Sequence, residues 1–263
     1  MWHHCPHPIF VPKTPNKLTP EPKPENAAHT CVIVNTGTLK CAGFHVAFGG
    51  RGSNLLEDVN LSGLSAVAVS LGSSHTVVLL ADGSVRAFGY CDHGRCGSGS
   101  TSSATSDSSA VDLGGGRAKA VAAGGSHTVV LMQDGSVRAF GWNAYGQLGL
   151  GDTQQRGGDP AQMGANLPAV ALGANLSAVA VAAGWAHTCV IVNTGTLKCA
   201  GFHVAFGGRG SNLLEDVNLS GLSAVAVRAF GNNDNGQLGL GDSNDRGDNS
   251  GEMGASLPPV DLG

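Results

Sequence analysis

The sequence predicts an all-β fold, an incomplete β-propeller of about four to five blades behind a disordered N-terminal tail. Three observations predict it. A strand–turn–strand pattern around His-Thr and a later glycine recurs along the chain. The recurring units are roughly 40–50 residues long, the length of blades built from several short strands. Glycine supplies 41 of the 263 residues, without the period of collagen.

The first segment, residues 1–26, is rich in proline, lysine and glutamate. Such a composition buries too little apolar surface to fold, so a disordered or extended tail is expected. His3, His4, Cys5 and His7 could bind a metal as a cluster. A flexible tail with chance ligands is the favoured interpretation, because metal sites need an ordered second shell. No metal or cofactor is predicted for the chain.

The propeller repeats are expected over residues 27–263, in approximate units 27–66, 67–119, 120–177, 178–224 and a truncated 225–263. His-Thr marks the first four units, at His29-Thr30, His75-Thr76, His127-Thr128 and His187-Thr188. The fifth unit lacks this strand, because Val227 runs directly into Arg228. Residues 28–69 and 186–227 are identical, which indicates a recent duplication or an assembled gene model.

The third unit shows how each strand pair is expected to form. Two strand-like runs, 128–132 and 136–140, flank Asp134-Gly135, and the first is rich in β-branched residues. Asp-Gly between such runs favours a two-residue type I′ hairpin. With that loop, Met132 would lie opposite Val137. Apolar groups on both faces of the hairpin predict that it is covered on both sides.

The flanks of this hairpin complete the expected blade. Val121–Gly124 is small and apolar, which suits a crowded inner strand. Gly146–Asp152 is too rich in glycine for a helix and is expected to form a tight turn with two leucines pointing inward. Gly97–Lys119 stands where the second unit should have the same turn. Its low complexity favours a flexible linker over a functional loop.

Cysteines flank the hairpin of the first unit and of its identical copy. With Thr36-Gly37 as a two-residue loop, Cys41 lies opposite Val32 and Cys31 opposite Ala42. The two sulfurs would then point to opposite faces, because side chains alternate along a strand. A disulfide within the hairpin is therefore disfavoured.

The segment Tyr90–Cys96 reads Tyr-Cys-Asp-His-Gly-Arg-Cys, which suggests a small metal cluster. Aligned with residues 142–148, however, Cys91 and Cys96 replace an asparagine and a leucine of the structural turn. Zinc normally takes four ordered ligands. Divergence of a structural turn is therefore the favoured interpretation.

The four repeat histidines sit at equivalent positions in different units. This placement favours a structural hydrogen-bonding role over a catalytic set, and no catalytic residue is predicted.

Composition excludes several function classes. Charged residues make up 13% and the net charge is −4, so no electrostatic footprint for nucleic acid is present. No apolar run is long enough to span a membrane. The N-terminus lacks the continuous apolar core of a secretory signal. An intracellular protein, cytoplasmic or nuclear, is expected, with its seven cysteines mostly buried as small apolar groups.

The repeat resembles the regulator of chromosome condensation family. The resemblance rests on Val121–Gly124, His127-Thr128, Asp134-Gly135, Val137–Gly141 and Gly146–Asp152. It implies a propeller, usually of seven blades. The family includes exchange factors for small GTPases, inhibitors of β-lactamase, a plant UV-B photoreceptor and modules of ubiquitin ligases. It therefore implies a binding surface and no single activity.

The chain departs from this family in two respects. The position of Phe88, Phe140 and Phe230, often tryptophan in the family, is alanine in the identical copies (Ala42 and Ala200), which should loosen their packing. The blades are too few for a ring of seven. A partial ring leaves strand edges exposed, which invites edge-strand association or coverage by the tail.

The leading hypothesis for function is a non-catalytic scaffold that binds a protein partner through its loops. An exchange factor for a small GTPase and an incomplete fragment of a larger repeat protein are the alternatives. Trp185, in Gly-Trp-Ala-His-Thr, resembles a photoreceptor tryptophan motif, but one copy is too little for a stacked antenna. The candidate binding residues, chosen by loop position, are Tyr90, Trp142, Asn143, Tyr145, Asn232, Asn233 and Asp234.

Overall fold

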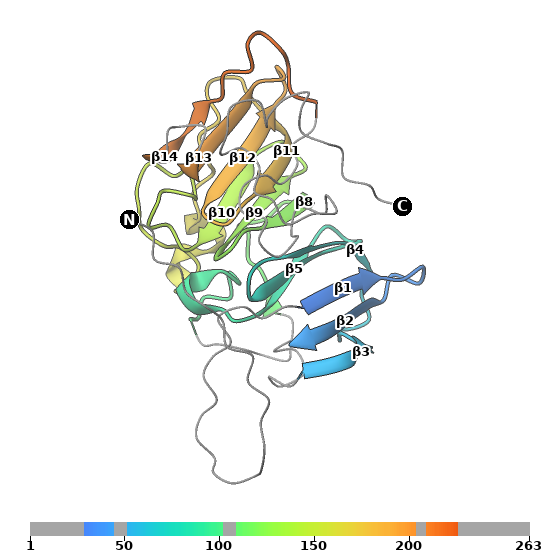
Figure 1. Cartoon of the computed structure of the whole chain (residues 1–263). Coiled ribbons are helices and arrows are strands. Elements are labelled where there is room, and N and C mark those ends of the chain that lie inside the picture. The colour runs from blue at the N-terminus through green and yellow to red at the C-terminus, as the bar shows by residue number, and fades with distance from the viewer. Residues whose placement is uncertain (1–28, 45–51, 102–108, 204–208, 226–263) are drawn as a thin grey trace, which may run out of the picture.

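The computed structural model of the chain describes residues 29–44, 52–101, 109–203 and 209–225. These residues form four antiparallel sheets of three or four strands. Figure 1 shows the sheets following one another in chain order, so each sheet is one blade. The predicted all-β propeller architecture is confirmed. The predicted tail and nearly all of the truncated fifth unit lie outside the described residues.

The blades are named here by their order in the chain. The first blade holds β1 (His29–Ile33), β2 (Leu39–Phe44) and β3 (Gly52–Asp58). The second holds β4 (Ala66–Leu71), β5 (His75–Leu80), β6 (Val85–Gly89) and β7 (Ser109–Ala110). The third holds β8 (Ala118–Ala123), β9 (His127–Met132) and β10 (Val137–Gly141). The fourth holds β11 (Ala178–Ala183), β12 (His187–Val192), β13 (Leu197–His203) and β14 (Arg209–Asp216). The short 3-10 helices are η2 (Asp92–Gly94), η3 (Pro160–Gln162) and η4 (Gly164–Asn166).

The strand that begins with His-Thr is the middle of each complete blade. In the third blade β9 pairs with β8 on one edge and β10 on the other, and all six of its residues are buried. Successive side chains of a strand point to opposite faces. Val129 and Leu131 therefore pack into the cluster shared with the fourth blade, while Val130 and Met132 pack into the cluster shared with the second. The prediction that the hairpin is covered on both sides is confirmed.

The predicted two-residue hairpin loop is wrong by one residue. Leu131, rather than Met132, lies opposite Val137. The Met132 N–H donates to the Ser136 carbonyl at 2.9 Å, which leaves three residues in the loop. A three-residue loop needs a left-handed backbone at one position only, and Gly135 supplies it with φ of 83°. Asp-Gly is compatible with both loops, so the dipeptide did not decide between them.

The same shift overturns the prediction for the cysteines of the first and fourth blades. Cys31 lies directly opposite Cys41, with Cα atoms 4.1 Å apart, and the two form a disulfide. A one-residue change of register moves a side chain to the other face of its strand, which is why the sulfurs meet. Cys189–Cys199 repeats this bond and Cys91–Cys96 is a third. Six of the seven cysteines are therefore paired, contrary to the expectation of mostly unpaired buried thiols.

The expected linker Gly97–Lys119 is in part a structural element of the second blade. Ser109–Ala110 forms β7 and pairs with β6 at Arg86 and Ala87. Val111 and Leu113 are then buried in the cluster between the second and third blades. These two apolar side chains, among many serines and glycines, anchor the outer strand. The prediction of a linker was based on the low complexity of the whole segment and overlooked them. Residues 102–108 lie outside the described residues.

Candidate protein-binding surface

The repeat histidines connect each blade to the next. Each imidazole Nε2 forms a hydrogen bond with the threonine hydroxyl of the following blade's His-Thr strand. The pairs are His29–Thr76 at 3.0 Å, His75–Thr128 at 3.0 Å and His127–Thr188 at 2.9 Å. The predicted structural role of these histidines is confirmed, with the addition that the bonds run between blades.

Burial keeps the two central histidines neutral. The Thr128 hydroxyl donates to the Arg95 carbonyl at 2.8 Å, so it accepts from a protonated Nε2 of His75. Burial, followed by the charges of Arg95 and His127, holds the pKa of His75 well below 6.5. Burial and the neighbouring His187 lower the pKa of His127 to about 3. These neutral rings connect each blade to the next, and so hold in place the blades that carry the loops described below.

A glycine three residues before His75, His127 and His187 makes room for each of these rings. A Cβ on Gly124 would lie 2.2 Å from Cε1 of His127, far inside van der Waals contact. It would also lie 2.6 Å from the carbonyl oxygen of Gly184 in the next blade. Gly72 and Gly184 face His75 and His187 in the same way. The glycine that ends the inner-strand motif is therefore a requirement of close packing near the blade interfaces.

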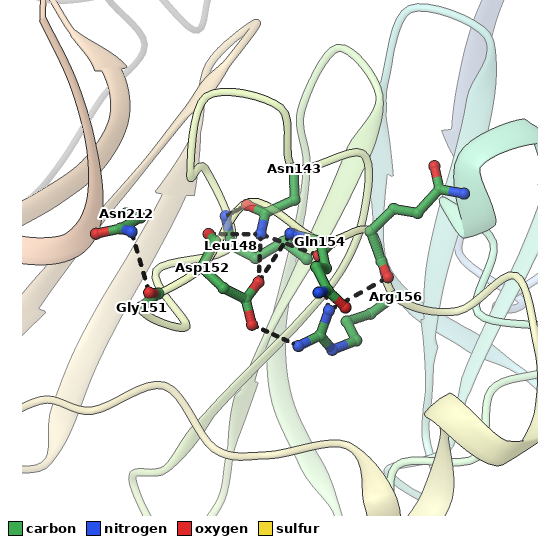
Figure 2. A network of polar contacts seen from close by, with 8 residues as sticks. Asn143, Leu148, Gly151, Asp152, Gln154, Arg156 and Asn212 are labelled. Carbon is green, nitrogen blue, oxygen red and sulfur yellow. Dashed lines mark hydrogen bonds and ion pairs between the residues drawn. The ribbon is translucent and has the colours of Figure 1, made fainter.

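The loop after β10 is held by a buried asparagine. The Asn143 amide donates to the carbonyls of Asp152 and Gln154, both at 3.0 Å, and its oxygen accepts the Leu148 N–H at 2.9 Å (Figure 2). The Arg156 guanidinium binds the Asp152 carboxylate at 2.7 Å from the same network. These contacts fix the whole span 143–156 as one closed loop.

The Gln-Leu-Gly-Leu-Gly turn of this loop also braces the fourth blade. The Gly151 N–H donates to the Asn212 carbonyl at 2.7 Å, and the Asn212 amide returns a bond to the Gly151 carbonyl at 3.0 Å (Figure 2). A Cβ on Gly146 would lie 2.4 Å from the Cα of Asn212. Leu148 is fully buried, as the predicted turn with inward leucines requires. The turn is therefore a contact between blades.

The loop after β6 of the second blade contacts the third blade, as the loop after β10 contacts the fourth, but it is closed in a different way. The Cys91–Cys96 disulfide closes a short loop around η2. A Cβ on Gly94 would lie 2.3 Å from the Gly158 nitrogen, so this loop lies against the return segment of the third blade. A disulfide thus closes the loop where the third blade uses an asparagine, in agreement with the predicted divergence of a structural turn.

Aromatic side chains from three blades gather on these loops. Trp142 makes edge contacts with Tyr145 at 5.3 Å and with Trp185 at 5.8 Å between ring centroids. Tyr145 lies 5.4 Å from Phe202, and His93 lies 6.3 Å from Trp142. Trp185 is 61% exposed, and Tyr145, Phe202 and His93 are exposed as well. We call these five residues the aromatic surface.

The structure places two of the seven predicted binding residues together. Trp142 and Tyr145 belong to the aromatic surface. Asn143 is fully buried and uses its amide within its own loop, so it shapes the surface from below. Tyr90 is half-buried, and its N–H donates to the Ser74 carbonyl at 2.8 Å. Asn232, Asn233 and Asp234 lie outside the described residues.

Three members of the aromatic surface were not predicted as binding residues: His93, Trp185 and Phe202. The sequence carried a usable signal for Trp185, since it lies two residues before His187 and must lie on the turn into the His-Thr strand. Its meeting with Trp142 depends on the packing of the third blade against the fourth, which no sequence spacing shows. Sequence reasoning therefore found only those members of the aromatic surface that lie on the third blade.

The described residues hold no group of three or more histidine, cysteine, aspartate or glutamate side chains placed to bind a metal. In the same ranges, no helix has the length and apolar character needed to cross a membrane.

Strand order, blade-to-blade hydrogen bonds and the loop contacts together define a β-propeller repeat protein. The family model of the regulator of chromosome condensation (RCC1) repeat matches residues 134–191, and a second model of this repeat matches 66–97 and 118–147. Residues 66–97 and 118–191 of the chain therefore match regulator of chromosome condensation repeats.

Individual proteins of known sequence or structure agree with this assignment. The chain is 30% identical over 165 residues to the ultraviolet-B receptor UVR8 of Arabidopsis thaliana, covering 59% of this chain and 33% of that protein. It is 38% identical over 88 residues to the X-linked retinitis pigmentosa GTPase regulator of Canis lupus familiaris, covering 34% and 9%. The structure of yeast RCC1 (Prp20) bound to Kap60 superposes with a TM-score of 0.59 and 19% identity, covering 78% of this chain and 49% of that chain. The chain thus spans a third or less of these two sequence relatives and about half of the solved propeller.

Proposed function

We propose that this chain is a non-catalytic propeller scaffold that binds a protein partner through its aromatic surface. The observation that carries the proposal is Trp185, which is 61% exposed and lies against Trp142 on an otherwise rigid platform. Tryptophan and tyrosine are the residues that most often dominate binding energy at protein interfaces. An aromatic ring held by a neighbouring ring loses little conformational freedom when a partner covers it.

The contacts that hold the loops under the aromatic surface favour a role of this surface in binding a partner over exposure by chance. The surface is built from loops of three blades, and each loop is fixed by the contacts described above: the Asn143 network, the Cys91–Cys96 bond and the Gly151–Asn212 bonds. Loops positioned by a rigid scaffold are where such folds carry function. A propeller of similar fold also binds proteins: the solved structure of Prp20p from Saccharomyces cerevisiae is described with its binding properties to Gsp1p and histones.

Site-directed photo-crosslinking tests the proposal in the full chain. Benzoylphenylalanine at Phe202 places a reactive ring of similar shape within the surface, and the same residue at Val67 places it on an exposed site of β4. We expect a discrete protein adduct from position 202 and none from 67. Adding Trp185→Ala should lower that adduct about 30-fold, the effect of losing one dominant interface residue. Equal adduct patterns from both positions would contradict the proposal.

A second candidate function is guanine-nucleotide exchange on a small GTPase. It is favoured by one relative, which carries the name GTPase regulator. Exchange would require the propeller to bind the GTPase in its nucleotide-free form. Release of labelled GDP from a panel of small GTPases, followed by stopped flow, separates this function from simple binding. If the chain accelerates none of them, the exchange hypothesis is rejected and the scaffold hypothesis stands.

A third candidate is that the chain is an incomplete piece of a larger repeat protein, favoured by its coverage of about half of a solved propeller, 49% of that chain. A cooperative thermal transition and a protease-resistant core for the isolated chain would argue against a non-functional fragment. Rapid digestion throughout the described ranges would support it.

The predicted cytoplasmic or nuclear location stays a prediction, and the disulfides offer a way to test it. Disulfides persist in oxidising compartments and are rare where glutathione keeps thiols reduced. Rapid alkylation of the chain in its native compartment counts the free thiols. Three intact disulfides account for six of the seven cysteines, so at most one thiol should react. Seven reactive thiols would place the chain in a reducing compartment.

A further inference from the structure

The amino-acid sequence contains three Asn-x-Ser motifs, and the middle residue is leucine in each. They are Asn60-Leu61-Ser62, Asn175-Leu176-Ser177 and Asn218-Leu219-Ser220. Asn-x-Ser with x other than proline is the acceptor motif for N-linked glycosylation, which occurs on surface loops of secreted proteins. The motif is short enough to arise by chance. Its meaning therefore depends on where the fold places each asparagine and on the compartment in which the chain folds.

The fold places all three asparagines on exposed turns. Asn60, Asn175 and Asn218 are each exposed, and each lies outside the strands. The residues beside them hold the backbone: Val59 and Leu61 are buried at 6% and 4%, on either side of Asn60. An exposed side chain on an anchored turn can carry a bulky sugar that projects into solvent and displaces no core residue.

The hydrogen bonds printed on two of these turns use the oxygen of the asparagine side chain. Oδ1 of Asn60 accepts the Ser62 N–H at 2.8 Å. Its duplicate, Asn218, accepts the Ser220 N–H in the same way at 2.8 Å. An asparagine that bonds the backbone two residues further on stabilises a local turn. A sugar is attached to Nδ2, so attachment leaves the accepting oxygen and its turn in place.

All three motifs lie at the end of the blades that carries the hairpin loops. After each motif an alanine N–H donates to the carbonyl of a hairpin glycine at 2.8 Å, in the pairs Ala66–Gly37, Ala178–Gly135 and Ala224–Gly195. The aromatic surface lies at the other end of the strands, on loops that follow β6 and β10 and precede β12. The six residues of β9 separate the two ends by roughly 17 Å, at about 3.3 Å per residue. Sugars on these motifs would therefore be attached on the face opposite to the aromatic surface.

The disulfides are independent evidence for the compartment. Cys31–Cys41, Cys91–Cys96 and Cys189–Cys199 pair six of the seven cysteines. Disulfides form and persist in secreted proteins and in the lumen of the secretory pathway, and they are rare where glutathione keeps thiols reduced. N-linked sugars are added in that same oxidising lumen. The paired cysteines and the exposed asparagines, which are different residues in different places, thus indicate one route of biosynthesis.

We propose that Asn60, Asn175 and Asn218 are N-glycosylated, and that the chain folds in the secretory pathway rather than in the cytoplasm or nucleus. The co-reactant is a sugar carried on a lipid diphosphate, and a transferase of the cell supplies the catalysis. The bond from Nδ2 to C1 of the sugar forms as the bond from C1 to the diphosphate oxygen breaks. The diphosphate leaves with the bonding electrons, and one amide proton passes to a base of the transferase. Glycosylation of this face is independent of what the aromatic surface binds.

Mass spectrometry of the full chain from its native source is the first test. Peptide N-glycosidase in heavy-oxygen water converts each glycosylated asparagine to an aspartate that carries the heavy isotope. We expect the label at Asn60, Asn175 and Asn218, and none at Asn212, which is exposed but lies outside any such motif. Absence of the label from all three positions would overturn the proposal. Equal label at Asn212 would indicate spontaneous deamidation and would overturn it as well.

Matched substitutions distinguish the acceptor motif from a structural role of the serine. Ser62→Ala, Ser177→Ala and Ser220→Ala each remove the hydroxyl that the motif requires and leave the asparagine in place. On a denaturing gel, each should remove one glycosidase-sensitive shift of the chain, whereas threonine at the same position should retain it. The denatured chain gives this answer even if a variant fails to fold. Alanine variants that keep every shift would overturn the proposal, as would seven reactive thiols in the alkylation experiment described above.

Discussion

Acid should weaken this propeller well before its carboxylates are protonated, because its blades are connected by buried neutral histidines. The clearest case is His127, whose ring is fully buried and bonded to Thr188 of the next blade. Burial lowers its pKa from 6.5 to about 3 in the folded chain. In the unfolded chain the ring recovers its ordinary pKa.

The sign of the effect follows from proton binding. Below pH 6.5 the unfolded state takes up a proton on His127 and the folded state does not, so falling pH favours unfolding. The stabilisation is fully present above the unfolded pKa and is lost as the pH falls toward the folded pKa. The whole shift corresponds to about 5 kcal/mol, of which about 2 kcal/mol is lost between pH 7 and pH 5. His75, whose pKa is also lowered by burial, adds to the loss in the same direction.

The assay is urea unfolding at pH 7 and pH 5, followed by the fluorescence of Trp142 and Trp185. The His127→Gln variant is the control, because glutamine can still form a hydrogen bond with Thr188 but does not titrate. We expect its loss of stability between the two pH values to be smaller than that of the unmodified chain by about 2 kcal/mol. Equal losses in the two proteins would show that His127 is protonated without cost in the folded state and would refute the reasoning.

Three further substitutions test the packing of the blades. Gly124→Ala should lower the free energy of unfolding by more than about 3 kcal/mol, because its Cβ would lie 2.2 Å from the His127 ring; a loss of less than about 1 kcal/mol in urea titration would contradict the close approach. Asn143→Ala leaves the Leu148 N–H and two loop carbonyls without their partner, which should cost about 2–4 kcal/mol and raise hydrogen exchange across the loop. Replacing Cys189 and Cys199 together by serine should cost about 2–3 kcal/mol, the effect of opening a loop of this length, and an unchanged melting temperature under oxidising conditions would argue against the bond.

Sequence reasoning reached the repeat architecture because it depends on local patterns. Each His-Thr strand carries β-branched residues, ends before a turn dipeptide and resumes toward a glycine, and these features are readable within about twenty residues. The inward leucines of the Gly146–Asp152 turn were predicted for the same reason. The hairpin register was missed because two loop lengths satisfy the same dipeptide, and that single residue decided whether Cys31 meets Cys41.

The aromatic surface likewise has one part that the sequence predicted and another part that only the structure showed. Trp142 and Tyr145 were found because both lie on one loop of the most complete unit, and Asn143 was chosen with them although its amide is buried. Trp185 and Phe202 come from the fourth blade, and their contact with the third exists only once the two blades pack.

The sequence by itself therefore determined the repeat pattern of this protein: the central strand pair of each unit, the dipeptide at its turn, and the histidine that marks each of the first four units. Tertiary structure alone decided what lies between blades. The His127–Thr188 bond and the aromatic surface join residues of separate units. The exposed Val32 and the buried Val190 occupy equivalent positions in identical sequences, and they differ only in what covers them. The physical reason is that strand and turn propensities act over neighbouring residues, whereas burial depends on which other surface a blade face meets.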